Sequence, residues 1–334
     1  MPDRVLLAHG SGGKLAHDLI ERVLLPPLKN PLLERLDDSA VFPVSGRMAF
    51  TTDSYIVTPI FFPGGDIGRL AVSGTVNDLS MVGAVPRYLS LSLIIEEGLP
   101  LSDLERVIRS VRDTAQEAGV EVVTGDTKVV GRGSADRLFL NTAGIGMIPE
   151  GVDISGSNAR TGDVVILSGT IGDHGIAVMS QREGLSFTSD IKSDAAPLNG
   201  LVEKMLTASK RIHTLRDPTR GGLASTLNEI ANQSRVGIQI EETQIPVRDS
   251  VRAACDMLGL DPLYVANEGK LVATVPEEDA DSILQAMRGH RYGADATIIG
   301  RIVVKHPKRV VMTTRLGTTR IVDMLTGEPL PRIC

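Results

Sequence analysis

The feature that most constrains the fold is a break near the middle of the chain. The segment "IPEGVDISGSNARTGD" is rich in Gly, Ser and Asn, and strand and helix patterns alternate on both sides of it. The chain has 334 residues, more than a single core usually accommodates. We therefore expect a mixed α/β (α+β) chain in four parts: a flexible Gly-rich arm over 1–30, a first domain over 31–152, a second domain over 153–322 and a flexible tail over 323–334.

Local patterns predict the main elements of both domains. "MAFTTD" and "YLSLSLII" indicate strands, and Asp66 is placed to cap a helix that ends before Gly83. "LSDLERVIRSVRDTAQEAG" predicts a helix with a Ser102–Glu105 capping box and a stop at Gly119. Further strands and helices are expected at "VEVVTGD", "RLFLNTAGIGMI", "DVVILSG", "KLVATV", "ATIIGRIV" and "RVVMTT", and near 198–211, 220–232 and 277–289.

Composition excludes several classes of protein. A net charge of −6 is unlike the basic face of a general nucleic-acid binder. No apolar run is long enough to span a membrane, and the first residues do not form a signal peptide. The cysteines Cys255 and Cys334 provide no disulfide framework or zinc site. We expect a cytoplasmic protein with reduced thiols, in which Cys255 belongs to the core and Cys334 is available.

Aspartates in glycine-rich segments are the main chemical signal. Asp53 and Asp126 follow the expected ends of strands, where open α/β folds place ligand sites. Asp78 lies in a small, apolar helix and needs a partner, because an unpaired buried carboxylate is costly. The set also contains Asp37, Asp38, Asp173 and Asp217. Any one of these residues alone is typical of a turn cap, but the set favours a Mg-nucleotide site.

Other candidates are weaker one by one. "HGSGGK" offers backbone N–H groups and Lys14 to a phosphate, or is a mobile arm. Lys128 follows Asp126 by two residues. Glu268 is a site residue or a solvated turn, and His174 is a base, a phosphate donor or a loop residue.

The last residue, Cys334 in "PLPRIC", is unusual. Chain ends tolerate change well, so a terminal thiol is an accident or belongs to a tail that carries sulfur from one place to another.

Taken in order, the motifs resemble a known family. They are "HGSGGK", "DDSAV", "TTDSY", "VNDLSMVGAVP", "GDTKV", "SGTIGDHG", "DPTRGGL", "NEGKL" and the terminal "PRIC". The set is similar to the HypE family of hydrogenase maturation factors, in the aminoimidazole ribonucleotide synthetase (PurM-like) superfamily. The resemblance implies a two-domain PurM-like fold and a homodimer. The N-terminal domains of the two copies would bind ATP and form a shared barrel.

The resemblance also implies an activity. A carbamoyltransferase, HypF, would load a carbamoyl group onto Cys334, and ATP would drive its dehydration to a thiocyanate. The cyano group would then pass to iron on a HypC–HypD scaffold.

Site residues follow from the matching motifs. The resemblance implies a metal site at Asp38, Asp53, Asp78 and Asp126, and nucleotide contacts at Gly12, Gly13, Lys14, Asp53, Asn77, Asp78, Gly125 and Asp126. The catalytic residues would be Cys334, Glu268 as base and Lys128 as electrostatic helper. His174 and Asp217 lie in matching motifs without an assigned role.

Two alternatives stay open. Another ATP-dependent synthetase of the superfamily, for selenophosphate or purines, has related motifs. Selenophosphate synthetases, however, carry a reactive Cys or selenocysteine near the N-terminus, whereas the first cysteine here is Cys255. A non-catalytic nucleotide-binding scaffold is the second alternative.

Overall fold

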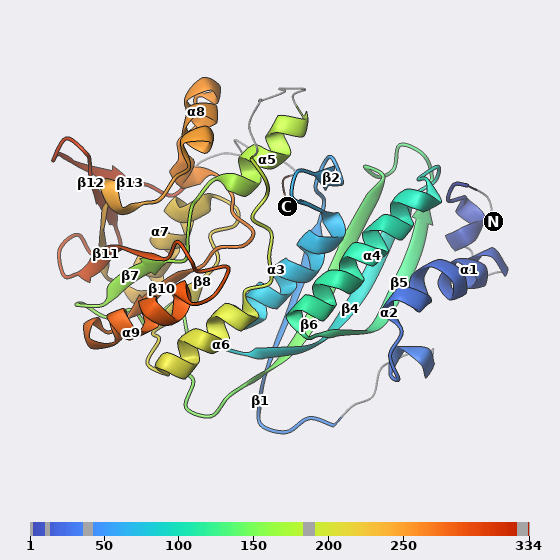
Figure 1. The fold of residues 1–334 in the computed structure, drawn as a ribbon, viewed down its shortest axis with the longest axis horizontal. Coiled ribbons are helices and arrows are strands. Elements are labelled where there is room, and N and C mark those ends of the chain that lie inside the picture. Colours follow the sequence, from blue (N-terminus) through green and yellow to red (C-terminus); the bar gives the residue numbers. More distant parts are fainter. Residues whose placement is uncertain (1–2, 11–13, 36–42, 183–190, 326–332, 334) are drawn as a thin grey trace.

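Two β-sheets, one from each half of the chain, form the framework of the molecule (Figure 1). The structure is a computed structural model that describes residues 3–10, 14–35, 43–182, 191–325 and 333. In the sequence, all strands of the first sheet come before residue 152 and all strands of the second come after it, in agreement with a mixed α/β chain. The domain boundaries themselves stay a prediction.

The first sheet has helices on one face only. Its strand order is β1-β6-β4-β5, and α3 and α4 cover the same face (Figure 1). Side chains along β6 alternate between buried and half-buried, which is typical of a sheet with one uncovered face. The elements are β1 (Arg47–Tyr55), α3 (Ile67–Met81), β4 (Val85–Glu96), α4 (Leu101–Ala118), β5 (Glu121–Val130) and β6 (Leu138–Ile148), with a small hairpin of β2 (Phe61–Phe62) and β3 (Gly65–Asp66).

The second sheet is covered on both faces. In β7, Val164 and Ile166 join the apolar cluster of α6 and α9, while Val165 and Leu167 join the cluster of α7. The strand order is β13-β12-β9-β11-β7-β10-β8. Its strands are β7 (Val164–Leu167), β8 (Thr214–Arg216), β9 (Gly237–Glu241), β10 (Val272–Val275), β11 (Thr297–Val303), β12 (Val310–Thr313) and β13 (Thr319–Val322), and the helices of this half are α5 (Asp173–Arg182), α6 (Asn199–Ala208), α7 (Gly222–Ser234), α8 (Asp249–Leu258) and α9 (Glu277–Arg288).

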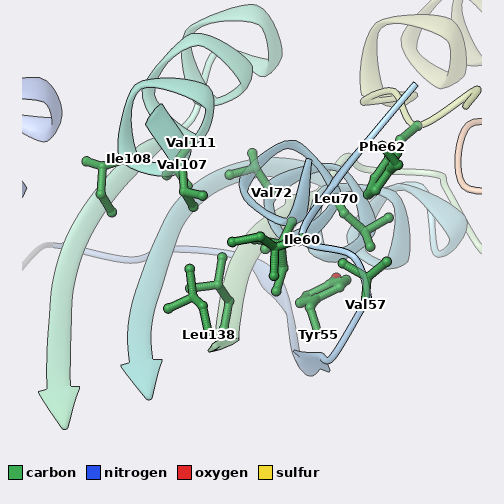
Figure 2. Packing of buried hydrophobic residues seen from close by; sticks show 14 of the residues in the cluster. Tyr55, Val57, Ile60, Phe62, Leu70, Val72, Val107, Ile108, Val111 and Leu138 are labelled. Carbon is green, nitrogen blue, oxygen red and sulfur yellow. The ribbon is translucent and has the colours of Figure 1, made fainter. Parts of the chain in front are cut away.

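The largest apolar cluster joins the two halves. Figure 2 shows its centre, where Leu70 of α3 and Val107 of α4 lie over the sheet. Ile176 of α5 and Cys255 of α8 belong to the same cluster, so the second half contributes to the core of the first. Cys255 is a core residue, as predicted.

Local signals at the helix ends gave correct predictions for the Asp66 cap and the Gly119 stop, and a wrong one for the capping box. Asp66 caps α3 by accepting hydrogen bonds from the N–H groups of Gly68 and Arg69 at 2.9 and 3.0 Å. The capping box in α4 does not form. Pro100 is the N-cap and makes no side-chain cap bond, and Ser102 is the second residue inside the helix.

The described part of the arm predicted over 1–30 packs against the first half of the chain, and its flexibility stays a prediction. Val5 is buried, and its N–H group donates to the Leu99 oxygen at 2.8 Å. Leu19 and Val23 are also buried. The helical segments are α1 (Lys14–Leu19), a π-helical turn (Ile20–Leu24) and α2 (Leu25–Leu28). Apolar residues at helical spacing therefore attach the segment to the first half.

None of the described helices combines the length and the apolar composition that crossing a bilayer requires.

Candidate active site

Acidic side chains from both halves surround a small cavity. Asp53 of β1 and Asp78 of α3 come from the first half, and Asp217 and Glu268 come from segments after β8 and before β10. The cavity has a volume of about 40 Å³ and is also lined by Ser54, Tyr55, Gly74, Thr219 and Arg220. The structure thus brings together Asp53, Asp78 and Glu268, which have predicted site roles, with Asp217, which sequence reasoning named without a role.

The two acids of the first half are positioned by the packing of α3 on β1. The hydroxyl of Thr51 donates to Asp78 Oδ2 at 3.0 Å. Asp53 pairs with Thr142, whose side chain faces α3 and donates to the Ala71 oxygen at 3.2 Å. Asp53 lies inside β1, not after its end as predicted, because the strand continues to Tyr55.

Burial raises the pKa of three of the cavity acids, Glu268, Asp217 and Asp78. Burial, reinforced by Asp217 and Asp194, raises the pKa of Glu268 well above its usual value. Burial and the neighbouring Asp78 raise the pKa of Asp217 to about 7. Burial also raises the pKa of Asp78, against the hydrogen bond from Thr51. The cluster therefore favours a cationic ligand, which would offset the repulsion among the acids.

Glu268 is held through its backbone. It is 3% exposed, and its Oε1 atom has no hydrogen-bond partner among the described residues. Its N–H group donates to Asp194 Oδ1 at 3.0 Å, and Lys270 Nζ lies 3.1 Å from the other oxygen of Asp194. A Cβ atom at Gly269 would lie 1.8 Å from the Asp194 backbone oxygen, so only glycine fits there. The backbone of Glu268 is thus fixed in place, while one oxygen of its carboxyl has no partner among the described residues.

The side chain of Asn77, which was predicted to contact the nucleotide, forms hydrogen bonds with the protein backbone. Its Nδ2 atom donates to the backbone oxygens of Ala196 and Glu268 at 3.1 and 3.2 Å. Its Oδ1 atom accepts from the Leu198 N–H at 2.7 Å. The side chain is therefore occupied in joining α3 to the second half.

Asp126 and Lys128 lie on the other face of the first sheet. Asp126 is opposite Ser92 on β4, and Lys128 is opposite Ile94. The neighbouring pair of Leu91 and Thr142 is buried under the helices. Because successive residues of a strand point to opposite faces, Asp126 and Lys128 point away from the helices. Lys128 Nζ lies 2.7 Å from Asp126 Oδ1. The prediction that Asp126 follows the end of a strand is wrong, because β5 runs to Val130. Within one chain these residues do not face the cavity.

Gly125 fits a close approach between strands. A Cβ atom there would lie 2.5 Å from the backbone oxygen of Leu91 on β4.

A metal site is not preformed among the described residues. No group of three or more His, Cys, Asp or Glu side chains in these ranges has metal-binding geometry. The carboxylate oxygens are nevertheless the donors that Mg²⁺ prefers, and Mg²⁺ is usually bound by one or two carboxylates together with substrate phosphates. The donor set therefore fits a magnesium ion that arrives with a nucleotide.

Ile333, the last residue that the structure describes, packs with residues of both halves. Ile333 is 4% exposed and belongs to the large apolar cluster. Its backbone oxygen lies 2.6 Å from Nε2 of His174. The residue before Cys334 is thus seated inside the molecule.

Some predicted residues lie outside the described ranges. They are Gly12, Gly13, Asp38 and Cys334, and the side chain of Lys14 at the start of α1.

Comparison with known families covers both halves of the chain. The N-terminal domain family of AIR synthase related proteins matches residues 36–148, and the C-terminal domain family matches residues 160–312. The "Carbamoyl dehydratase HypE" of Rhizobium leguminosarum bv. viciae is 56% identical over 333 residues, which cover 99% of this chain and 95% of that protein. The chain belongs to the HypE family of carbamoyl dehydratases, enzymes of hydrogenase maturation.

Solved HypE structures share the fold. A crystal structure of HypE in complex with ATP has 52% identity and a TM-score of 0.96, covering 98% of this chain and 99% of that one. A HypE–HypF complex has 51% identity and a TM-score of 0.82, covering 92% of this chain and 99% of that one. The predicted family and PurM-like fold are confirmed.

Sequence reasoning missed the loop that supports the site. Ser193 and Asp194 lie in "KSDAAP", which has no motif of its own. Their positions depend on contacts with His174 and Glu268, distant in sequence.

Proposed function

We propose that this chain converts an S-carboxamide on Cys334 to a thiocyanate at the expense of ATP, supplying cyano ligands for the iron of [NiFe] hydrogenase. The observation that carries this proposal is the buried Ile333, bonded to His174 next to the loop that holds Glu268. In this proposal, a tail seated there would carry the adjacent Cys334 toward the acidic cavity.

The overall reaction balances with ATP as the only co-substrate. The carboxamide oxygen attacks the γ-phosphorus, ADP leaves, and the carbon–nitrogen unit loses one N–H proton. The carbon–oxygen bond then breaks, phosphate departs with the oxygen, and loss of the second N–H proton leaves the S–C≡N group. Phosphorylation is needed because an amide oxygen is by itself a poor leaving group.

Glu268 is the base in this proposal. Its unpaired Oε1 atom and its raised pKa suit a group that takes a proton from nitrogen. Asp53, Asp78 and Asp217 would hold magnesium, with Asp38 as a further ligand implied by the family. When bound with ATP, the ion supplies positive charge for phosphoryl transfer. The site's own carboxyls would lose their protons as that charge arrives.

A second copy of the chain would bring Lys128 and Asp126 to the site. Both lie on the open face of the first sheet, which also exposes Met48, Phe50 and Ile94. An apolar sheet face of this kind favours burial against another copy. We propose that the homodimer forms there and that the helper and ligand roles of Lys128 and Asp126 act across the interface.

The partners follow from the same proposal. A relative has been solved with HypF, so HypF would load the tail of this chain in the cytoplasm. A HypC–HypD scaffold would accept the cyano group.

Glu268→Gln tests the proposed base. The protein is loaded with HypF and carbamoyl phosphate, given Mg-ATP, and followed by intact mass. We expect the variant to carry the carbamoyl adduct but to lose water at least about a hundredfold more slowly than the wild type. This is the lower end of the rate contribution that a general base usually makes. Equal rates of water loss would contradict the assignment.

A further inference from the structure

A buried histidine at the start of α5 holds the end of the chain. His174 Nε2 lies 2.6 Å from the Ile333 backbone oxygen, and Nδ1 lies 2.8 Å from Ser193 Oγ. His174 has no exposed surface, and the proposed chemistry does not use it. One ring nitrogen thus contacts the tail, and the other contacts the loop beside Glu268.

These contacts determine the tautomer of His174. A backbone oxygen only accepts hydrogen bonds, so Nε2 must carry a hydrogen. Burial lowers the pKa of His174, so the ring is neutral near pH 7 and has a single N–H group. Nδ1 therefore accepts from the Ser193 hydroxyl, whose oxygen accepts in turn from the Ala195 N–H at 3.1 Å.

The ring and the tail are also fixed by packing. Phe62 meets the imidazole edge to face, with ring centroids 5.5 Å apart and an interplanar angle of 89°. The Ile333 side chain belongs to the apolar cluster that contains Phe62. Among the described residues, a hydrogen bond from His174 and the packing of one apolar side chain thus hold Ile333.

We propose that His174 is a positioning residue: it seats the tail by donating one hydrogen bond to the Ile333 carbonyl, and Ser193 sets the tautomer that makes this bond possible. The inference rests on the proposed function, since seating matters for a tail that is loaded elsewhere and processed inside. Loss of this bond would favour the released tail.

The seat is connected to the proposed base. Ser193 is followed by Asp194, whose Oδ1 atom accepts from the Glu268 N–H at 3.0 Å. Asp194 is also paired with Lys270. The same loop therefore positions the tail, through His174, and the backbone of Glu268.

The test compares His174→Gln with His174→Asn in the full-length protein. The Gln amide reaches the position of Nε2 and can donate to Ile333, whereas the shorter Asn reaches only the position of Nδ1. Tail release is read as the rate at which N-ethylmaleimide labels Cys334, measured by intact mass. Cys255 is an internal reference, because burial raises its pKa to about 11 and slows its labelling.

We expect Asn to speed Cys334 labelling about five- to tenfold, the effect of losing one hydrogen bond. Gln should stay within about twofold of the wild type. Equal labelling of the two variants would overturn the proposal. If neither folds, Ser193→Ala should speed labelling about twofold by freeing the other tautomer, and an unchanged rate would overturn the proposal instead.

A second measurement separates positioning from a general defect. The Asn variant should be loaded with carbamoyl at least as fast as the wild type but lose water more slowly. A structural defect would slow both steps. If the wild type itself loses no water, the proposed function fails, while the labelling ratio still decides the role of His174.

Discussion

At the scale of the residue, the site depends on how firmly its buried carboxyls hold protons. Glu268 is buried and Asp217 is half-buried. Burial raises the pKa of both, and a neighbouring carboxyl raises each further, Asp217 for Glu268 and Asp78 for Asp217. In the absence of a cation such groups favour the neutral form. A positively charged ligand would convert them to ligands or bases, so nucleotide binding and activation of the site would occur together.

Asp217→Asn tests whether Asp217 is protonated in the folded chain, through the pH dependence of the free energy of unfolding. The pKa of Asp217 is about 7 in the folded chain and about 3.9 in the unfolded chain. Folding therefore takes up a proton between these values, and the wild type loses stability as the pH rises toward 7. The free energy of unfolding of the variant should therefore rise relative to that of the wild type by roughly 1 kcal/mol per pH unit up to about pH 7. Above that pH the difference should level off. Urea unfolding at several pH values measures it, and a gain independent of pH would show that Asp217 is already ionised.

Asp78→Asn tests the proposed metal role. Loss of one carboxylate ligand should weaken Mg-ATP binding about tenfold or more by calorimetry. The matched control is Asp113→Asn on α4, whose side chain is exposed and paired with Arg112. Equal affinity of both variants would assign Asp78 a structural role.

At the scale of the element, α3 supports both sides of the site. It carries Asp78 toward β1 and Asn77 toward the second half. Its approach to α4 is so close that a Cβ atom at Gly68 would lie 2.5 Å from the Val107 backbone oxygen. The helix position, and with it the cavity, depends on this contact.

Gly68→Ala has an effect whose sign is informative. In a free helix the change stabilises by up to about 1 kcal/mol, but overpacking against α4 should destabilise by about 1–3 kcal/mol. Denaturant unfolding measures the difference. Gly131→Ala is the control, because a Cβ atom there meets nothing within 4 Å. A more stable Gly68 variant would contradict the close packing.

The homodimer proposed on the open face of the first sheet should dissociate when a charge is placed on that face. Phe50 is 66% exposed on β1, and Phe50→Asp should shift the dimer to monomer by placing a charge in an apolar interface. Met257→Asp on α8 is the matched control, since Met257 is 73% exposed outside that face. Sedimentation gives the masses, and an unchanged dimer in the Phe50 variant would locate the interface elsewhere.

Elements with local signals were predictable, and long-range placement was not. Asp66 caps α3 through neighbours two and three residues away, and Gly119 ends α4 with a φ of 68°. The capping box failed because Pro100 starts α4 earlier, where the Leu101 N–H bonds Asp3 from the N-terminal segment. Spacing places Asp126 and Lys128 on one face of a strand, but only the sheet register shows that this face is opposite Asp53.

At the scale of the whole molecule, the site exists only where the halves meet. Asp53 and Asp78 come from one half, and Asp217 and Glu268 come from the other. Arg69 helps to join them, with Nε donating to the Ala195 oxygen at 2.6 Å and Nη2 donating to the Tyr292 hydroxyl at 3.2 Å. The tail enters the same junction through Ile333.

The central claim is that the terminal thiol carries the group that this site dehydrates. The most direct measurement is the intact mass of wild type and Cys334→Ala after incubation with HypF, carbamoyl phosphate and Mg-ATP. The wild type should gain one carbamoyl group and then become lighter by one water, while the variant gains no adduct. A carbamoyl adduct on the variant, or a wild-type adduct that never loses water, would contradict the account.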